Sequence, residues 1–253
     1  MSELIKTCLE DGVLNVVMNR ADKKNAITQA MYLEMTKAIN MARTNDDVRV
    51  VLITAEGNDF SAGNDIADFM TLAQSEGSLV DSDVFLFLKA LADMDKPMIA
   101  AVRGRAVGVG LTMLLHCDMV VVAKDAMLSA PFINLALAPE AASTMLLPNV
   151  IGHPRAFELF ALGEVIDGGT AYDWGLANRA VSAVMVDETA WELARKLTTR
   201  APNSLRRTKA LMRDSAKLWA LMQEEGAVFA SQMQSPEAME AFTAFMQKRA
   251  PKF

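Results

Sequence analysis

The sequence is poor in side chains that bind metals or form disulfides. Its 253 residues include two cysteines, Cys8 and Cys117, and two histidines, His116 and His153, with no C-x-x-C pair. This set argues against a disulfide framework and a zinc site. It also gives little material for a Ser-His-Asp triad. Cys117 lies in an apolar run, where a small buried side chain is expected. We therefore expect a reducing cytoplasm and no bound metal.

Positive charge is also scarce. The chain has 25 Lys and Arg against 31 Asp and Glu, which gives a formal net charge of −6. Nucleic-acid binding depends on clustered basic side chains that release counterions, so we expect no nucleic-acid partner. The dense basic runs are interpreted first as solvated surface, and they lie at residues 23–24, 206–207 and 248–252.

Long hydrophobic runs are missing as well. The apolar stretches are interrupted by Gly, Arg, His or Asp before they reach membrane-spanning length. Residues 1–4 show no basic segment leading into an apolar one, so no signal or transit peptide is expected. Residues 250–253 differ from a peroxisomal S-K-L address. We expect a cytoplasmic protein without a membrane partner. Apolar residues still make up 52% of the chain, enough for a sizeable core.

Short β-rich runs alternate with helical patterns along most of the chain. We expect strands at residues 14–18, 50–53, 98–102 and 119–122, and a helix that begins after Thr28. Near residue 188 the β signals stop and helical stripes follow. The pattern predicts an α/β fold with mostly parallel pairing over residues 1–190 and a helical region over 191–253. Amphipathic helices need a partner surface, which is either the core or another subunit.

Two glycine-containing turns lie where a strand leads into a helix. One is Ala62-Gly63-Asn64-Asp65, and the other is Gly108-Val109-Gly110, which opens an apolar helix over 111–117. Glycine permits a positive φ, and the N–H after it is free at the start of a helix. Two such donors on one oxygen would form an oxyanion hole. The alternative is that both glycines only make tight turns.

Glu140 is the candidate general base. It follows Pro139, and Pro followed by Glu is also the ordinary opening of a helix. Its neighbours over residues 135–147 are mostly small or apolar. A carboxyl group in such surroundings has a raised pKa, which suits proton abstraction near neutral pH.

Several runs together resemble the crotonase (enoyl-CoA hydratase/isomerase) superfamily. They cover nearly the whole chain in order, at residues 19–26, 60–66, 96–102, 104–110, 117–118, 133–135, 174–176 and 245–249. The resemblance implies a spiral core of repeated β-β-α units with a helical C-terminal trimerisation region. It also implies a homotrimer or dimer of trimers that acts on acyl-CoA thioesters without a metal or redox cofactor.

The resemblance also implies the site. The oxyanion donors would be the backbone N–H groups of Asn64 and Val109. The acyl pocket would include Phe132, Leu137 and Pro139. The CoA-binding residues would be Lys23, Lys24, Ala26, Ala62, Gly63, Asp65, Ile66 and Gly108.

The chain departs from the hydratases at two positions. They carry two glutamates that activate water, and the matching residues here are Thr112 and Phe132. Glu140 instead resembles the single glutamate of the Δ3,Δ2-enoyl-CoA isomerases, especially the peroxisomal type. This implies that Glu140 removes a proton from C2 and returns it at C4. Two alternatives stay open. The first is another enolate-type lyase or hydratase reaction on an unusual acyl group, and the second is a non-catalytic acyl-CoA-binding protein.

Overall fold

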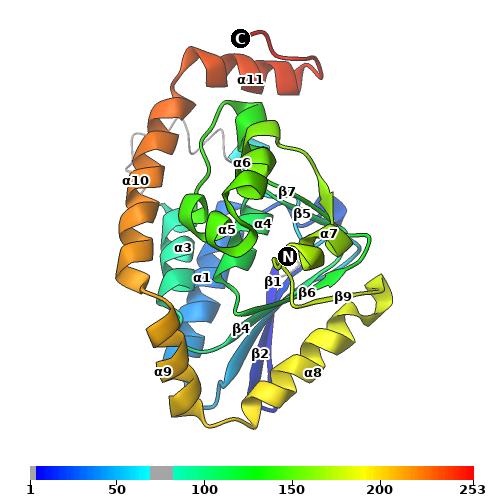
Figure 1. Cartoon of the computed structure of the whole chain (residues 1–253), viewed down its shortest axis with the longest axis vertical. Helices are drawn as coiled ribbons and strands as arrows, with labels where there is room; N and C mark the ends of the chain where they lie inside the picture. The colour runs from blue at the N-terminus through cyan, green and yellow to red at the C-terminus, as the bar shows by residue number, and fades with distance from the viewer. Residues whose placement is uncertain (1–3, 69–81) are drawn as a thin grey trace.

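The structure is a computed structural model that describes residues 4–68 and 82–253. Its main sheet has six strands in the order β1-β2-β3-β4-β6-β9 (Figure 1). The pairs are parallel except for β1 with β2. The strands are β1 (Ile5–Glu10), β2 (Val13–Met18), β3 (Val50–Ala55), β4 (Met98–Val102), β6 (Met119–Ala123) and β9 (Arg179–Val181). The four strand predictions are confirmed: β4 has the predicted bounds, and the other three differ by one or two residues at one end.

The central strands are apolar because both of their faces are covered. Every residue of β3 and β4 is buried. Leu52 of β3 pairs with Ile99 of β4, and Ala100 pairs with Val120 of β6. Parallel neighbours require a crossover outside the sheet, and these crossovers carry the candidate site.

A second, smaller sheet runs alongside the first. It consists of β5 (Arg105–Val107), β7 (Met127–Ser129) and β8 (Ile166–Asp167). Parallel bridges between Ile27 and Asn64 and between Ser61 and Ala106 continue the same pattern. Each turn of chain thus gives one strand to the main sheet and then one segment to the second. β4 is followed by β5, and β6 by β7. The predicted crotonase spiral is confirmed.

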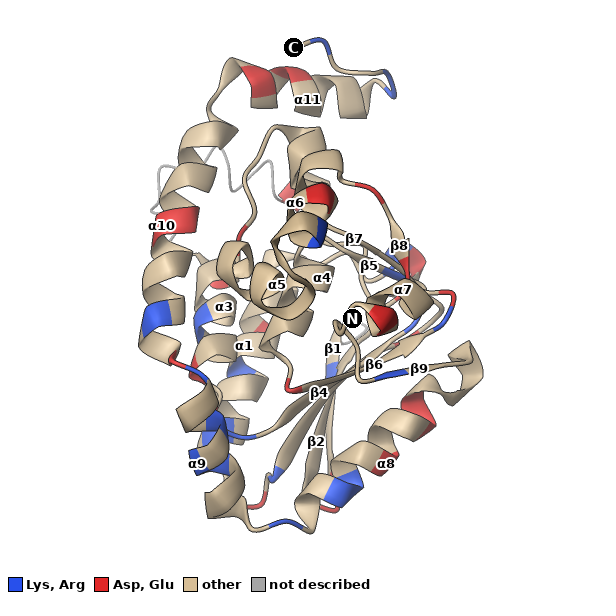
Figure 2. Ribbon diagram, in the orientation of Figure 1, with Lys and Arg blue, Asp and Glu red and all other residues tan. Residues whose placement is uncertain are grey.

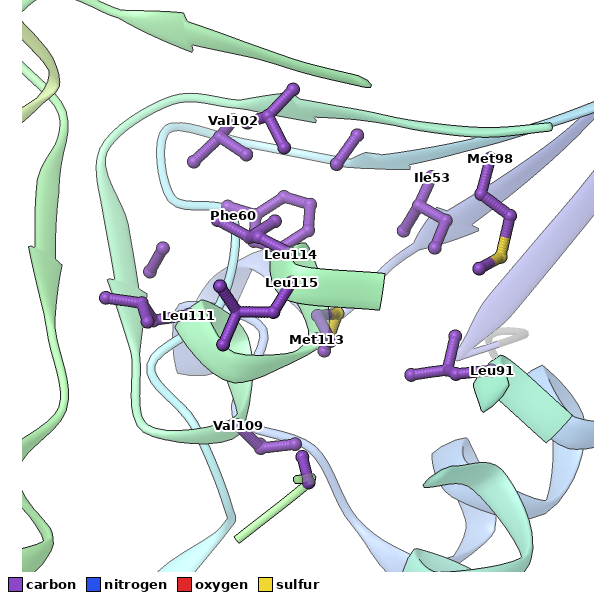
Figure 3. Packing of buried hydrophobic residues seen from close by; sticks show 14 of the residues in the cluster. Ile53, Phe60, Leu91, Met98, Val102, Val109, Leu111, Met113, Leu114 and Leu115 are labelled. Atoms are coloured by element: carbon purple, nitrogen blue, oxygen red, sulfur yellow. The ribbon is translucent and has the colours of Figure 1, made fainter. Parts of the chain in front are cut away.

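The first helix begins where its sequence predicts. α1 (Gln29–Thr44) starts after Thr28, whose side chain accepts a hydrogen bond from the Met31 N–H. Its buried stripe, which includes Met31, Met35 and Ile39, packs against α3 (Asp83–Asp93). The helix expected at 111–117 is different, because α4 (Val109–Thr112) makes one α turn and η3 (Met113–His116) continues it as a 3-10 helix. Figure 3 shows Leu111 and Leu114 of this segment near Phe60 and Val102 in the core.

The chain also contains short elements joined by turns. They are η1 (Ala21–Lys23), η4 (Pro131–Leu135), α5 (Ser143–Ile151), α6 (His153–Leu162), α7 (Gly168–Asp173) and η5 (Ala183–Met185). η4 lies against α6 and, from the far end of the sequence, against α11.

The C-terminal helices pack on the core of their own chain. They are α8 (Val186–Thr198), α9 (Pro202–Met212), α10 (Ser215–Met233) and α11 (Pro236–Met246). α8 packs across β3, β4 and β6. Because this helix begins at Val186, the predicted boundary at residue 190 falls inside it. α10 runs beside α3, and α11 lies across one end of the molecule (Figure 1). Figure 2 shows acidic residues midway along α10. None of the helices in the described ranges is long and apolar enough to span a membrane.

Candidate active site

A cavity of about 460 Å³ lies between the two glycine turns and the C-terminal helices. Its wall includes residues 62–66 from the first turn and 107–109 from the second. Phe229 of α10 and Phe245 of α11 close the other side. Most of the side chains in the wall are apolar, as expected for a site that takes a largely apolar ligand.

The first turn is built around a glycine that no other residue can replace without strain. Gly63 has φ +87°, and a Cβ at this position would lie 2.8 Å from the Val107 carbonyl oxygen. Ser61 secures the same turn, because its Oγ donates to the Asn25 carbonyl at 2.9 Å and accepts the Gly63 N–H at 3.1 Å. The chain therefore turns sharply, and Asn64 follows at the cavity wall.

The second turn has the same form. Gly108 has φ +55° and donates its N–H to the Ser129 carbonyl at 2.9 Å. Val109 is the first residue of α4 and lines the cavity together with Asn64. Within the described part of the chain, neither the Asn64 nor the Val109 backbone N–H donates a hydrogen bond to another protein group. Two unused donors thus belong to the wall of one cavity.

The residues predicted to bind CoA fall into two groups. Six of them line the cavity, namely Ala26, Ala62, Gly63, Asp65, Ile66 and Gly108. Lys23 and Lys24 are exposed and lie outside the wall, on the turn beside it. That turn is joined to the first glycine turn because the Ala62 N–H donates to the Lys24 carbonyl at 2.9 Å.

An ion pair that the sequence did not reveal holds the cavity-lining acid. Arg20 Nη1 lies 2.7 Å from Asp65 Oδ2, and it donates to the Ala26 carbonyl at 2.9 Å. The hydrogen bond from Arg20 holds the pKa of Asp65 below its ordinary value. Asp65 Oδ1 also accepts the N–H groups of Ala67 and Asp68, as a helix cap does.

Two of the three predicted acyl-pocket residues are in the wall. Phe132 and Leu137 line the cavity, and Pro139 does not. Sequence reasoning did not assign six further lining residues to the site, Val107, Pro131, Asn134, Leu135, Phe229 and Phe245.

Glu140 is a buried acid in a turn, not the start of a helix. α5 begins only at Ser143, and Ala141 and Ala142 have φ angles of 64° and 54°. The residue is 7% exposed and is absent from the cavity wall itself. Its Oε1 accepts a hydrogen bond from Thr112 Oγ1 at 2.6 Å. Its Oε2 is buried and has no hydrogen-bond partner in the described part of the chain.

The surroundings make Glu140 a base for neutral or slightly alkaline pH. Burial raises its pKa from the ordinary 4.5 to about 8, the Thr112 hydrogen bond opposes that rise, and the charge of Glu225 adds to it. Thr112 follows Val109 by three residues in α4, so the two lie on one face of this helix turn. The rise of 1.5 Å per residue places Thr112 about 5 Å along the axis from Val109. The Glu140 carboxyl group is therefore hydrogen-bonded to the same short helix whose first residue, Val109, carries the free N–H.

Tyr32 connects α1 to this region. Its side chain is fully buried, and its hydroxyl donates to Asn64 Oδ1 at 2.5 Å. Burial, and after it the negative charge of Glu140, raises the pKa of Tyr32 well above the usual range. Tyr32 therefore stays protonated and steadies the residue that carries one of the two free N–H groups. In the sequence it is only one more position on the buried stripe of α1.

Comparison with known proteins agrees with this geometry. The family model described as Enoyl-CoA hydratase/isomerase matches residues 9–253. Enoyl-CoA delta isomerase 2 of Rattus norvegicus is 31% identical over 96% of this chain, which spans only 63% of that relative. The 2,3-dehydroadipyl-CoA hydratase of Escherichia coli (strain K12) is 31% identical over 100% of this chain and 99% of its own length.

A solved structure extends the likeness to three dimensions. OdaA of Pseudomonas aeruginosa superposes with a TM-score of 0.92, at 45% identity over 97% of this chain and 99% of OdaA. Since the family model spans residues 9–253 and the spiral fold is shared, this chain belongs to the enoyl-CoA hydratase/isomerase (crotonase) family.

Proposed function

We propose that this member of the family is a Δ3,Δ2-enoyl-CoA isomerase with Glu140 as its proton shuttle. The observation that carries the proposal is a buried acid with a pKa of about 8, hydrogen-bonded to the short helix α4 whose first residue offers a free backbone donor at the cavity wall. The hydratases that resemble this chain carry two glutamates, and the matching residues here are Thr112 and Phe132. A threonine hydroxyl and a phenyl ring cannot act as carboxylate bases toward water.

The proposed reaction moves one proton and one double bond. The thioester carbonyl accepts hydrogen bonds from the Asn64 and Val109 N–H groups, which stabilise the enolate oxygen. Glu140 removes a proton from C2, so the C2–H electron pair forms the C1=C2 bond of a dienolate and the carbonyl π pair moves onto the oxygen. When the carbonyl re-forms, the C1=C2 pair becomes the C2=C3 bond and the C3=C4 pair takes the same proton back at C4. The product is the conjugated 2-enoyl thioester. The step is redox-neutral and the proton is conserved, so the proposal requires no metal or redox cofactor.

The two oxygens of Glu140 suit this role differently. Oε1 is held by Thr112, which fixes the orientation of the carboxyl group. Oε2 has no hydrogen-bond partner in the described ranges and is the oxygen we assign to the substrate. A buried polar atom without a partner costs about 1–3 kcal/mol, and such atoms gather at functional sites. Phe132 in the cavity wall disfavours a bound water at the same place.

Binding of the CoA portion follows from the same wall. We propose that residues 62–66 contact the nucleotide arm through their backbone and that Lys23 and Lys24 meet its phosphates. We also propose a homotrimer or dimer of trimers. Its support is the exposed apolar side chains of the outer helices, which include Phe157 on α6 and Met239 and Met246 on α11.

The test compares two substrates. Purified protein is incubated with a 3-enoyl-CoA and, separately, with a 2-enoyl-CoA, and the thioesters are followed by liquid chromatography. We expect conjugated product from the first and little hydroxyacyl-CoA from the second.

Glu140→Gln should lower kcat by about 10²–10⁴-fold, the range of general acid–base catalysis, and should still bind acyl-CoA. The matched control is Glu158→Gln, which changes an exposed acid on α6.

Three other outcomes would contradict the proposed isomerase or its base. Rapid hydration of the 2-enoyl-CoA would contradict the isomerase and favour a hydratase that works without the two usual glutamates. Tight acyl-CoA binding with no turnover of any chain length would favour a non-catalytic binding protein. Full activity of Glu140→Gln would remove this residue as the base.

A further inference from the structure

One face of α10 is turned toward the site. Glu225, Phe229 and Gln232 are spaced i, i+4 and i+7, so they lie in a row along this helix. Phe229 lines the cavity. Gln232 Oε1 accepts the Ala138 N–H at 2.5 Å, two residues before the base. The helix can approach closely because Gly226 faces Phe85 of α3, where an added Cβ would lie 2.2 Å from the ring.

Glu225 binds the turn that follows the base. It is 6% exposed. Its Oε2 accepts the Ala142 N–H at 2.6 Å, and its Oε1 accepts the Thr144 N–H at 3.1 Å and the Thr144 hydroxyl at 2.5 Å. All three partners are donors, and an ionised carboxylate is the form that only accepts hydrogen bonds. Burial raises the pKa of Glu225 above its ordinary value, and these hydrogen bonds oppose that rise by favouring the charged form.

A third contact to the same turn comes from His116. His116 is fully buried, and burial lowers its pKa to about 3, so the ring is neutral. Its Nε2–H donates to the Ala141 carbonyl at 2.8 Å, and its Nδ1 accepts from Arg213 at 2.5 Å. Residues 138, 141 and 142 are therefore all held by side chains outside the turn.

The turn needs such support. Ala141 and Ala142 are consecutive residues in the left-handed region, with φ angles of 64° and 54°. This conformation costs a residue with a Cβ roughly 1–2 kcal/mol, and it persists only where surrounding contacts impose it. The direction of the Glu140 side chain depends on these two residues, since they follow it directly in the chain.

We infer that Glu225 is a positioning residue for the base: it fixes the left-handed turn that presents Glu140 and keeps a second negative charge near it. The effect of Glu225 on catalysis rests on the proposed function, whereas its support of the turn and its effect on the Glu140 proton do not. The polar groups that face Glu140 are the Tyr32 phenol from α1, the Thr112 hydroxyl from α4 and Glu225 from α10, with neutral His116 and then Arg213 behind the turn. Glu225 is the negative charge in this set, so its loss makes Glu140 give up its proton at lower pH.

Two substitutions separate the two roles. Glu225→Gln keeps the length of the side chain and removes its charge. Glu225→Asp keeps the charge and shortens the reach by one methylene. The matched control is Glu224→Gln, which removes a charge from the adjacent, exposed position of the same helix. Thermal unfolding of each variant identifies any that fails to fold.

The first readout is the pH profile of kcat/KM for isomerisation. For Glu225→Gln we expect the acidic limb to move to lower pH, and for Glu225→Asp a fall in kcat of about tenfold, since a small misplacement of the base costs about that much or more. Glu224→Gln should match the parent chain in both. A Glu225→Gln profile identical to that of Glu224→Gln, together with an unchanged Glu225→Asp, would overturn the inference.

The second readout does not depend on activity. Infrared difference spectra of ¹³C-glutamate-labelled protein follow the protonated carboxyl band with pH, and Glu140→Gln identifies the part of that band due to Glu140. We expect this part to titrate at lower pH in Glu225→Gln. If Glu140→Gln keeps full isomerase activity, the proposed function fails while this titration still tests the link between the two acids. An unmoved titration would refute that link even in an active isomerase.

Discussion

The two sides of the candidate site are built in opposite ways. The donor side consists of backbone N–H groups from two local turns, each set by a glycine within a few residues. The base side is a single carboxyl group on a turn held by partners 83 and 94 residues further along the chain. The donor side should therefore tolerate changes of side chain and fail when a glycine is replaced. The base side should respond to distant side chains.

Apart from replacement of the base itself, the largest effect is expected from Gly63→Ala, which changes the donor side. The new Cβ would lie 2.8 Å from the Val107 oxygen and would strain a φ of +87°, so the Asn64 N–H moves away from the thioester. Losing one such donor costs about 10²–10³-fold in kcat. Gly175→Ala is the control, at another positive-φ glycine whose nearest such contact is 3.8 Å. Equal kcat in the two variants would show that the first turn only shapes the fold.

The next effect concerns the pH dependence of the free energy of unfolding, which reports the raised pKa of Glu140. Its pKa is about 8 when folded and ordinarily 4.5, so between these values the folded chain holds a proton that the unfolded chain has released. The free energy of unfolding should therefore fall as pH rises from 4.5 to 8, by at most about 1.4 kcal/mol per pH unit from this group. Glu140→Gln should flatten this slope in urea unfolding measured across that range. A slope equal to that of the parent chain would mean that Glu140 titrates as an ordinary surface acid.

A smaller effect is expected from Thr112→Val, which keeps the shape of the residue and removes the donor to Glu140. The Thr112 hydrogen bond lowers the pKa of the base, so its loss should move the acidic limb of kcat/KM to higher pH. At pH 7 activity should fall about tenfold, consistent with 1.5–3 kcal/mol for a hydrogen bond to a charged group. Thr243→Val on α11 is the matched control. A shift to lower pH would contradict the assigned role of Thr112.

The smallest effect is expected at the exposed turn beside the cavity. Replacing Lys23 and Lys24 together by Gln should raise KM about threefold at low ionic strength and leave kcat unchanged, because exposed charges act weakly and are screened by salt. The control is Lys196→Gln on α8. A change in kcat with constant KM would exclude a role limited to CoA binding.

The strands and the two glycine turns that form the donor side could be predicted from the sequence. Continuous β-branched runs mark the buried strands, and glycines before a helix mark the two turns. Both signals are local, so a short stretch of chain contains them. Its apolar surroundings and then the family resemblance favoured Glu140 among the acidic residues as the proposed base. The 3-10 continuation after Thr112 and the absence of Pro139 from the cavity wall were not predicted, because each depends on how a turn packs.

The supports of the base could not be predicted in the same way. Glu225 and Gln232 look like ordinary polar residues on an amphipathic helix, and Tyr32 looks like one more core position. The signals that distinguish them are burial and contacts with residues far away in sequence, as for Arg20 with Asp65. No spacing rule connects α10 to residue 140, so this part required the three-dimensional arrangement.

The position of Phe245 has a consequence for which thioesters fit. This ring belongs to α11, the last helix, and is 57% exposed, yet it forms part of the cavity wall. A long fatty tail that leaves the cavity on this side emerges next to α11. Any surface that covers α11 would then help to decide how many carbons the enzyme accepts, so assembly and tail-length preference would be selected together.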